Sequence, residues 1–300
     1  VFVNGILYDG EECWERGTGT TWPELLYSEA SLDDFGIYLF KYKTGVFSGR
    51  YRLGDAVDAL KEYLRLDSVL EGRSVAFVCH SMGGIVVRKF LVERSADLIS
   101  NHIRCGLFMV ASPSLGSDYA SWLAPLARLL GNTQADALRF SQDNAWLNDL
   151  DKEFTNLKES GKLEIVGKEL IEDVFGVLPG LWRKQTVEAF SGARYFGEPF
   201  KVPNADHGSI AKPSDANAIQ HRLLCDFLKT AFSGQRFKHS PSDRRLLDAN
   251  RAGNHVTVPN QGLIDGASDS DHRVRDDDIR PRSLTPFASS TGHRQILVAG

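Results

Sequence analysis

The chemistry of this chain is centred on a serine in the stretch AFVCHSMGGIVVRKFL, residues 76–91. Ser81 lies in a run close to the G-x-S-x-G pattern of nucleophilic serines, with Cys79 where that pattern has its first glycine. A serine hydroxyl becomes a useful nucleophile when a sharp strand-to-helix turn presents it and a base takes its proton. Such a turn needs small residues on both sides of the serine. Since Gly83 is small and Cys79 is small enough, we expect Ser81 to be a nucleophile.

The base that activates such a serine is expected in a loop near the end of the domain, after the last strand. His207, in VPNADHGSIAKP, holds that place just before a closing helix. His80 is adjacent to Ser81, and neighbouring side chains on so tight a turn point apart. We therefore predict His207 as the base and His80 as a packing or hydrogen-bonding group.

The third member of the triad is a carboxylate that orients the imidazole, and in this kind of fold it comes between the serine and the histidine. It should end the strand before the last one. Glu169 is our first choice in KLEIVGKELIEDVFG, with Glu172 and Asp173 just beyond it. Glu188, in QTVEAFSGARYFG, is the alternative. Asp206 directly precedes His207 in the sequence, and its side chain is not expected to reach the ring of this neighbour in the way needed to orient it.

Two backbone N–H groups are expected to stabilise the oxyanion that forms when the serine attacks. One is the amide of Met82, directly after the nucleophile. The other is expected in the loop after the first strand, VFVNGILYDG, where Gly5 lets the backbone turn toward the site. We assign this second donor to Ile6.

The elements that must position these residues alternate between strands and helices. Strands are expected at residues 1–6, 35–42, 74–79, 104–111, 162–170 and 185–190, and helices at 22–30, 53–64, 83–93 and 216–232. This alternation predicts an α/β fold with a mostly parallel sheet covered by helices on both faces.

Two segments interrupt this alternation. Residues 117–160 have a helical pattern without a strand, and we expect them to form a cap over the carboxyl edge of the sheet. From residue 233 the chain is rich in Asp, Arg, Ser and Gly, so we expect a disordered tail over 233–300 after a domain over 1–232. The chain opens on Val1 and ends on RQILVAG, which suggests a fragment whose last residues enter the first strand of another domain.

Composition narrows the classes of function. The chain has 300 residues, 42% of them apolar, and a formal net charge of −4, so nothing favours nucleic-acid binding. The longest apolar runs are far too short to span a membrane. Four cysteines are widely separated and without metal-ligand pairing, which favours a reducing compartment and a cytoplasmic location.

Several of these motifs taken together resemble a known family. VFVNGI, FVCHSMGGIVVRKFLVE, MVASPSLGS and ADHGSIAKP are similar to the lipase/serine-esterase branch of α/β hydrolases, which includes serine-active-site-containing protein and GPI inositol-deacylase relatives. Members of that branch often have a cysteine at the place of Cys79. The resemblance implies an α/β-hydrolase fold and carries over Ser81 as nucleophile and His207 as base, with Glu169 as a loose match to the family's acid.

The resemblance also implies an activity. It predicts a serine esterase, lipase or transacylase that acts on lipid or acyl esters and needs no metal or organic cofactor. Peripheral membrane contact and further domains of the same chain are expected partners, because this module also occurs ahead of nucleotide-binding and repeat regions in large signalling proteins. The alternatives are a catalytically silent module of a larger signalling or defence protein and, less favoured, a peptidase of the same fold.

Overall fold

The computed structural model describes residues 1–5, 10–17, 19–42, 53–113, 144–173, 195–232 and 296–299. Its strands are β1 (Phe2–Val3), β2 (Ile37–Phe40), β3 (Ser74–His80), β4 (Arg104–Val110), β5 (Ile165–Glu172), β6 (Phe200–Val202) and β7 (Ile296–Ala299). Its α-helices are α1 (Trp22–Tyr27), α2 (Leu53–Leu66), α3 (Gly83–Glu93), α4 (Ser95–Ser100), α7 (Asn144–Glu159) and α8 (Ile219–Phe232). Short 3-10 turns are η1 (Gly10–Cys13), η2 (Ala30–Leu32), η3 (Val69–Glu71) and η4 (Ser209–Ala211). None of these helices is both long and apolar enough to cross a membrane.

The strands form one seven-stranded sheet in the order β6-β5-β4-β3-β1-β2-β7. All neighbouring strands in it run parallel. After β1 the chain first adds β2 on one side and then β3 on the other, so the order reverses between β1 and β3. Ligand sites in open α/β sheets lie outside the carboxyl ends of the strands at such a reversal. Ser81 directly follows β3 and therefore lies at this point.

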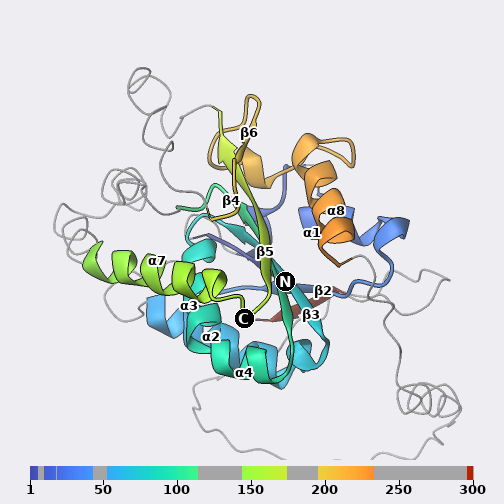
Figure 1. Cartoon of the computed structure of the whole chain (residues 1–300). Coiled ribbons are helices and arrows are strands. Elements are labelled where there is room, and N and C mark those ends of the chain that lie inside the picture. The colour runs from blue at the N-terminus through green and yellow to red at the C-terminus, as the bar shows by residue number, and fades with distance from the viewer. Residues whose placement is uncertain are drawn as a thin grey trace, which may run out of the picture. The chain divides into compact units, whose positions relative to one another are not determined.

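One hydrophobic core lies on each face of the sheet. Because side chains along a strand alternate between the two faces, successive residues pack into different cores. In β3, Phe77 packs into the first core and Val78 into the second. In β4, Leu107 packs into the first core and Phe108 into the second. Helices α2, α3 and α7 contribute to the first core, and α1 and α8 to the second. Figure 1 shows the two groups of helices on opposite sides of the sheet.

These features confirm the expected fold class. The chain has an α/β-hydrolase fold, with parallel strands, helices on both faces, and a strand-to-helix turn at Ser81 after a central strand.

Two expectations about the elements change, those for the end of the tail and for the cap. The tail expected to be disordered over 233–300 contains β7, which pairs with β2 over Ile37–Phe40. The strand expected at 185–190 lies outside the described residues, and β6 takes the edge next to β5. The remaining tail residues, 233–295, also lie outside the described part of the chain.

The cap expected over residues 117–160 is wrong for its second half. Two adjacent parallel strands need a crossover connection, and α7 lies in the connection between β4 and β5. It packs on α3, and its Phe154 is fully buried in the first core. This helix therefore belongs to the layer that covers the sheet. Residues 117–143 lie outside the described residues.

A buried ion pair fixes α7 to α3. The guanidinium of Arg88, on α3, is fully buried and donates to the Asp151 carboxylate of α7, to the Tyr195 hydroxyl and, at 2.7 Å, to the carbonyl of Pro113. The Tyr195 hydroxyl in turn donates to Asp151. Nε of Arg88 donates within α3, to the Gly84 carbonyl at 3.2 Å. The other donors bond to parts of the chain distant in sequence, so the network joins α3, α7 and the loop after β4.

Removing the Asp151 carboxylate should destabilise the protein strongly. Asp151→Ala leaves a buried guanidinium without its counter-charge, which costs about 3–5 kcal/mol of unfolding free energy. Asp149→Ala, on the same helix, removes an exposed pair with Lys152 and should cost less than about 1 kcal/mol. Urea denaturation of the two variants measures both values, and equal small effects would contradict the role of the network.

Candidate active site

The backbone of Ser81 adopts a left-handed conformation, with φ of +54°. A non-glycine residue rarely adopts it, and here it turns the chain sharply from β3 into α3. Two neighbours hold the turn. The Ser81 N–H donates to the Val110 carbonyl at 2.9 Å, and the Ser112 hydroxyl donates to the Ser81 carbonyl at 2.7 Å. The turn is thus fixed by the end of β4.

Glycine is required at two places beside this turn because the backbone of β1 approaches it closely. A Cβ on Gly83 would lie 2.4 Å from the Val3 carbonyl oxygen. A Cβ on Gly5 would lie 2.7 Å from the Cβ of Ser81. Cys79, in contrast, points into the first core and is fully buried there, so the missing glycine of the motif is accommodated by packing.

Ser81, His207 and a carboxylate form a continuous chain of hydrogen bonds. The Nε2 atom of His207 lies 3.0 Å from the Ser81 hydroxyl oxygen. Its Nδ1 atom lies 2.7 Å from Oε1 of Glu172. With Nδ1–H donating to the carboxylate, Nε2 has a lone pair directed at the serine hydroxyl. This is the arrangement in which an imidazole can take the serine proton.

The carboxylate beside His207 is Glu172, and the expectation of Glu169 is wrong. The Glu169 carboxylate accepts instead from the backbone N–H groups of Tyr195 at 2.7 Å and Phe196 at 3.3 Å. The alternative acid, Glu188, lies outside the described residues.

The wrong choice of carboxylate comes from the position at which β5 was expected to end. The expected strand stopped at Leu170, whereas β5 continues through Ile171 to Glu172. Ile171 is β-branched and apolar, so the sequence did carry a signal that the strand goes on. Glu172 and Leu170 lie on the same face of the strand, and Glu169 lies on the other. The position at which β5 ends therefore decides which carboxylate lies beside His207.

The loop that carries His207 is shaped by its own polar side chains. The Asp206 carboxylate accepts from the backbone N–H groups of Gly208 at 3.1 Å and Ser209 at 2.7 Å. Asp173, next to Glu172, accepts from the N–H of Asn204 at 3.1 Å. Asp206 therefore acts on the loop backbone and not on the ring of its neighbour, as expected.

One expected oxyanion donor lies at the start of α3. Met82 occupies the N-cap position of this helix, where backbone N–H groups have no acceptor within the helix. The second expected donor, Ile6, lies outside the described residues. Gly5, just before it, is packed against Ser81, so the chain leaves β1 beside this serine.

His80 is fully buried beside the catalytic loop. Its Nε2 atom lies 2.8 Å from the backbone carbonyl oxygen of His207. Burial, together with the neighbouring charge of His207, lowers the pKa of His80 from 6.5 to about 3. The ring is therefore neutral at physiological pH, and it makes a hydrogen bond from its place next to Ser81.

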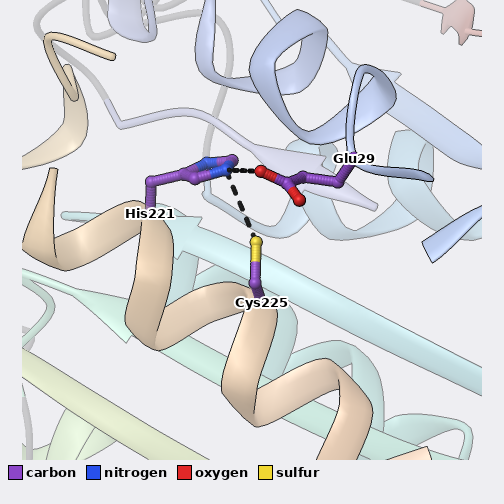
Figure 2. A group of neighbouring side chains, drawn as sticks. All are labelled: Glu29, His221 and Cys225. Carbon is purple, nitrogen blue, oxygen red and sulfur yellow. Dashed lines mark hydrogen bonds and ion pairs between the residues drawn. The ribbon is translucent and has the colours of Figure 1, made fainter. Parts of the chain in front are cut away.

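A second cluster contains three types of metal ligand, Glu29, His221 and Cys225 (Figure 2). The Nε2 atom of His221 lies 3.1 Å from the Glu29 carboxylate and 3.4 Å from the Cys225 sulfur. Its Nδ1 atom is buried without a hydrogen-bond partner, whereas a metal-bound histidine normally donates from its other ring nitrogen. An Nε2–H of His221 that donates to Glu29 accounts for the contact. We interpret the cluster as a hydrogen-bonded link between α8 and the segment after α1.

Exchanging the two carboxylates of β5 for amides should separate their roles. Glu172→Gln removes the acceptor that holds Nδ1–H of His207, so labelling of Ser81 by a fluorophosphonate should slow by up to about 10⁴-fold. Glu169→Gln keeps an oxygen that can accept from Tyr195 and should label at nearly the normal rate. The reverse result would restore Glu169 as the acid.

Burial of a neutral His80 should make stability depend on pH. Between about pH 3 and the ordinary pKa of 6.5, the unfolded state binds a proton at this ring and the folded state does not. The free energy of unfolding should therefore rise with pH there, by up to about 1.4 kcal/mol per pH unit from His80 alone. In His80→Gln, the free energy of unfolding should rise less steeply with pH. Denaturation curves of both proteins between about pH 4 and pH 6 measure this dependence, and equal dependences in the two proteins would contradict a neutral buried ring.

Sequence comparison gives distant relatives. No protein-family model matches the chain. The protein SERAC1 of Danio rerio is 24% identical over 242 residues, which cover 79% of this chain and 36% of that protein. The protein SERAC1 of Bos taurus is 24% identical over 165 residues, covering 54% of this chain and 24% of that protein. The chain thus spans about a third or less of the length of these relatives.

Structure comparison gives a phospholipase. The phospholipase PlaB from Legionella pneumophila, in complex with thio-NAD, is 19% identical, with a TM-score of 0.45, over 58% of this chain and 38% of that chain. A second structure of PlaB from Legionella pneumophila has a TM-score of 0.40 at 19% identity, over 57% of this chain and 38% of that chain. The fold assignment rests on the sheet topology and not on these similarities. The resemblance to GPI inositol-deacylase relatives stays an expectation.

Proposed function

We propose that this chain is a serine hydrolase of carboxylic esters that works through Ser81, His207 and Glu172. The observation that carries the proposal is the chain of hydrogen bonds from the serine hydroxyl through both ring nitrogens to a carboxylate whose side chain is only 4% exposed. The three residues come from separate parts of the sheet, since Ser81 follows β3, Glu172 ends β5 and His207 follows β6. A surface serine with no chemical role does not need such an arrangement.

The proposed reaction begins with attack of the Ser81 oxygen on the ester carbonyl carbon. His207 takes the hydroxyl proton at Nε2, and Glu172 stabilises the resulting imidazolium through Nδ1–H. The Met82 amide, together with that of Ile6, donates to the oxyanion of the tetrahedral intermediate. When this intermediate collapses, the C–O bond to the alcohol breaks and His207 returns the proton to the leaving oxygen. Water or an acceptor alcohol then attacks the acyl-serine by the same steps in reverse. All groups in this scheme belong to the protein.

The substrate class follows from the sequence resemblance and is part of the proposal. The motifs around Ser81 and His207 are similar to those of lipases and serine esterases, so lipid or acyl esters are the proposed substrates. Acyl transfer to an alcohol is compatible with the same groups. A cytoplasmic location, peripheral membrane contact and further domains of the same chain belong to this proposal too.

A fluorophosphonate probe tests the nucleophile directly. The unmodified chain should be labelled, and Ser81→Ala and His207→Ala should lose labelling, because removing either triad member costs about 10⁶-fold in kcat in the serine protease subtilisin. Ser100→Ala, which removes an exposed serine on α4, serves as the control and should label normally.

The outcomes separate the candidates. Failure of the folded, unmodified chain to label would favour the catalytically silent module. Labelling that persists in Ser81→Ala would overturn the choice of nucleophile. Turnover of acetyl, butyryl and palmitoyl p-nitrophenyl esters without cleavage of peptide anilides would support an esterase over a peptidase, and the preferred acyl length would define the substrate.

A further inference from the structure

A buried thiol and a buried imidazole connect three parts of the active site. The sulfur of Cys13, at the end of η1, lies 3.2 Å from Nδ1 of His80. The other ring nitrogen of His80 lies 2.8 Å from the His207 carbonyl oxygen. The backbone of Gly5 hydrogen-bonds to the same sulfur. Both Cys13 and His80 are fully buried.

The chemistry of these groups fixes the direction of each hydrogen bond. A carbonyl oxygen only accepts, so Nε2 of His80 must carry the hydrogen that points to His207. The ring is neutral, because burial lowers its pKa to about 3, and its Nδ1 is then an acceptor. The thiol of Cys13 can supply the matching hydrogen, since burial raises its pKa to about 12 and keeps it protonated.

All hydrogen bonds of this series therefore run in the same direction, and both side chains in it are uncharged. The Gly5 N–H donates to the Cys13 sulfur, the Cys13 S–H donates to Nδ1 of His80, and Nε2–H of His80 donates to the His207 carbonyl. The opposite tautomer of His80 would set a nitrogen lone pair against the carbonyl lone pairs. The edge of Trp14 beside the ring, with 6.2 Å between centroids, limits its rotation.

We propose that Cys13 and His80, here called the Cys13–His80 pair, are positioning residues for the reaction. The pair holds the backbone of His207 at the distance at which Nε2 reaches the Ser81 hydroxyl. It also ties the end of β1, from which the second oxyanion donor is expected, to the same unit. The inference rests on the proposed hydrolase activity. Neither residue touches the ester, so both act through the groups they hold.

The first test separates positioning from folding. Cys13→Ala removes the thiol hydrogen and should lower kcat for p-nitrophenyl butyrate by roughly 10- to 100-fold with KM nearly unchanged, as expected for a small displacement of a catalytic group. Cys13→Ser retains a donor and should recover most of the loss. Cys105→Ala removes another fully buried thiol, near the start of β4, and should leave kcat unchanged. An unchanged kcat in folded Cys13→Ala would overturn the proposal.

A double-mutant cycle tests whether the two residues act as one unit. Because Cys13 acts on His207 through the His80 ring, Cys13→Ala should cost much less in kcat once His80→Ala is present, with only its effect through the Gly5 backbone remaining. Additive losses would show that the two residues act independently, which the proposal does not allow.

A spectroscopic test does not depend on activity. Nitrogen-15 NMR of the imidazole rings should show His80 as a neutral Nε2–H tautomer that stays neutral at about pH 5, and Cys13→Ala should shift its Nδ1 signal. A neutral Nδ1–H tautomer of His80 would contradict the proposed hydrogen bond from Cys13 and overturn the proposal. If the chain fails to label with fluorophosphonate, the proposed function fails, while the NMR result still decides whether the pair exists.

Discussion

The left-handed backbone at Ser81 is the constraint on which the rest of the site depends. A non-glycine residue in this conformation costs of the order of 1–3 kcal/mol unless its surroundings hold it. Here the end of β4 does so, through the Val110 carbonyl and the Ser112 hydroxyl. The turn also needs β1 close by, so close that Gly83 has no space for a side chain. Ser81 is therefore held at the reversal of strand order, where it is fully buried, only because the two strands that flank β3 are both in place.

The imidazole is held by its backbone as well as by its ring. The ring bonds to Ser81 and Glu172, while the loop around it bonds to Asp206 and, through its carbonyl, to His80. A ring fixed only by its own two hydrogen bonds would move with the loop. Support of the backbone from the buried side is what allows a loop residue to meet a serine on a rigid turn.

The sequence predicted the parts of this site that depend on local pattern. Ser81 follows from the small residues around it, and His207 from its place before the closing helix. The choice of carboxylate could not be made in this way, because it depended on where β5 ends. Pairing with β6 at Leu170–Glu172 extends that strand. The place of β7 in this sheet was missed for a related reason, since its four residues follow a long polar segment and pair with a strand distant in sequence.

The two glutamates of β5 show how the alternation of side chains along a strand decides which carboxylate lies beside His207. Glu169 faces the core that contains Tyr195 and binds that residue's backbone N–H. Glu172 faces the same way as Leu170, into the core that also holds Ile210 of the turn after His207. The loop with the histidine packs on this second face, so a carboxylate on the first face would have to reach through the plane of the sheet. A glutamate three residues earlier, although closer to the expected strand end, therefore cannot replace Glu172. The same strand thus anchors the α7 layer on one face and orients the base on the other.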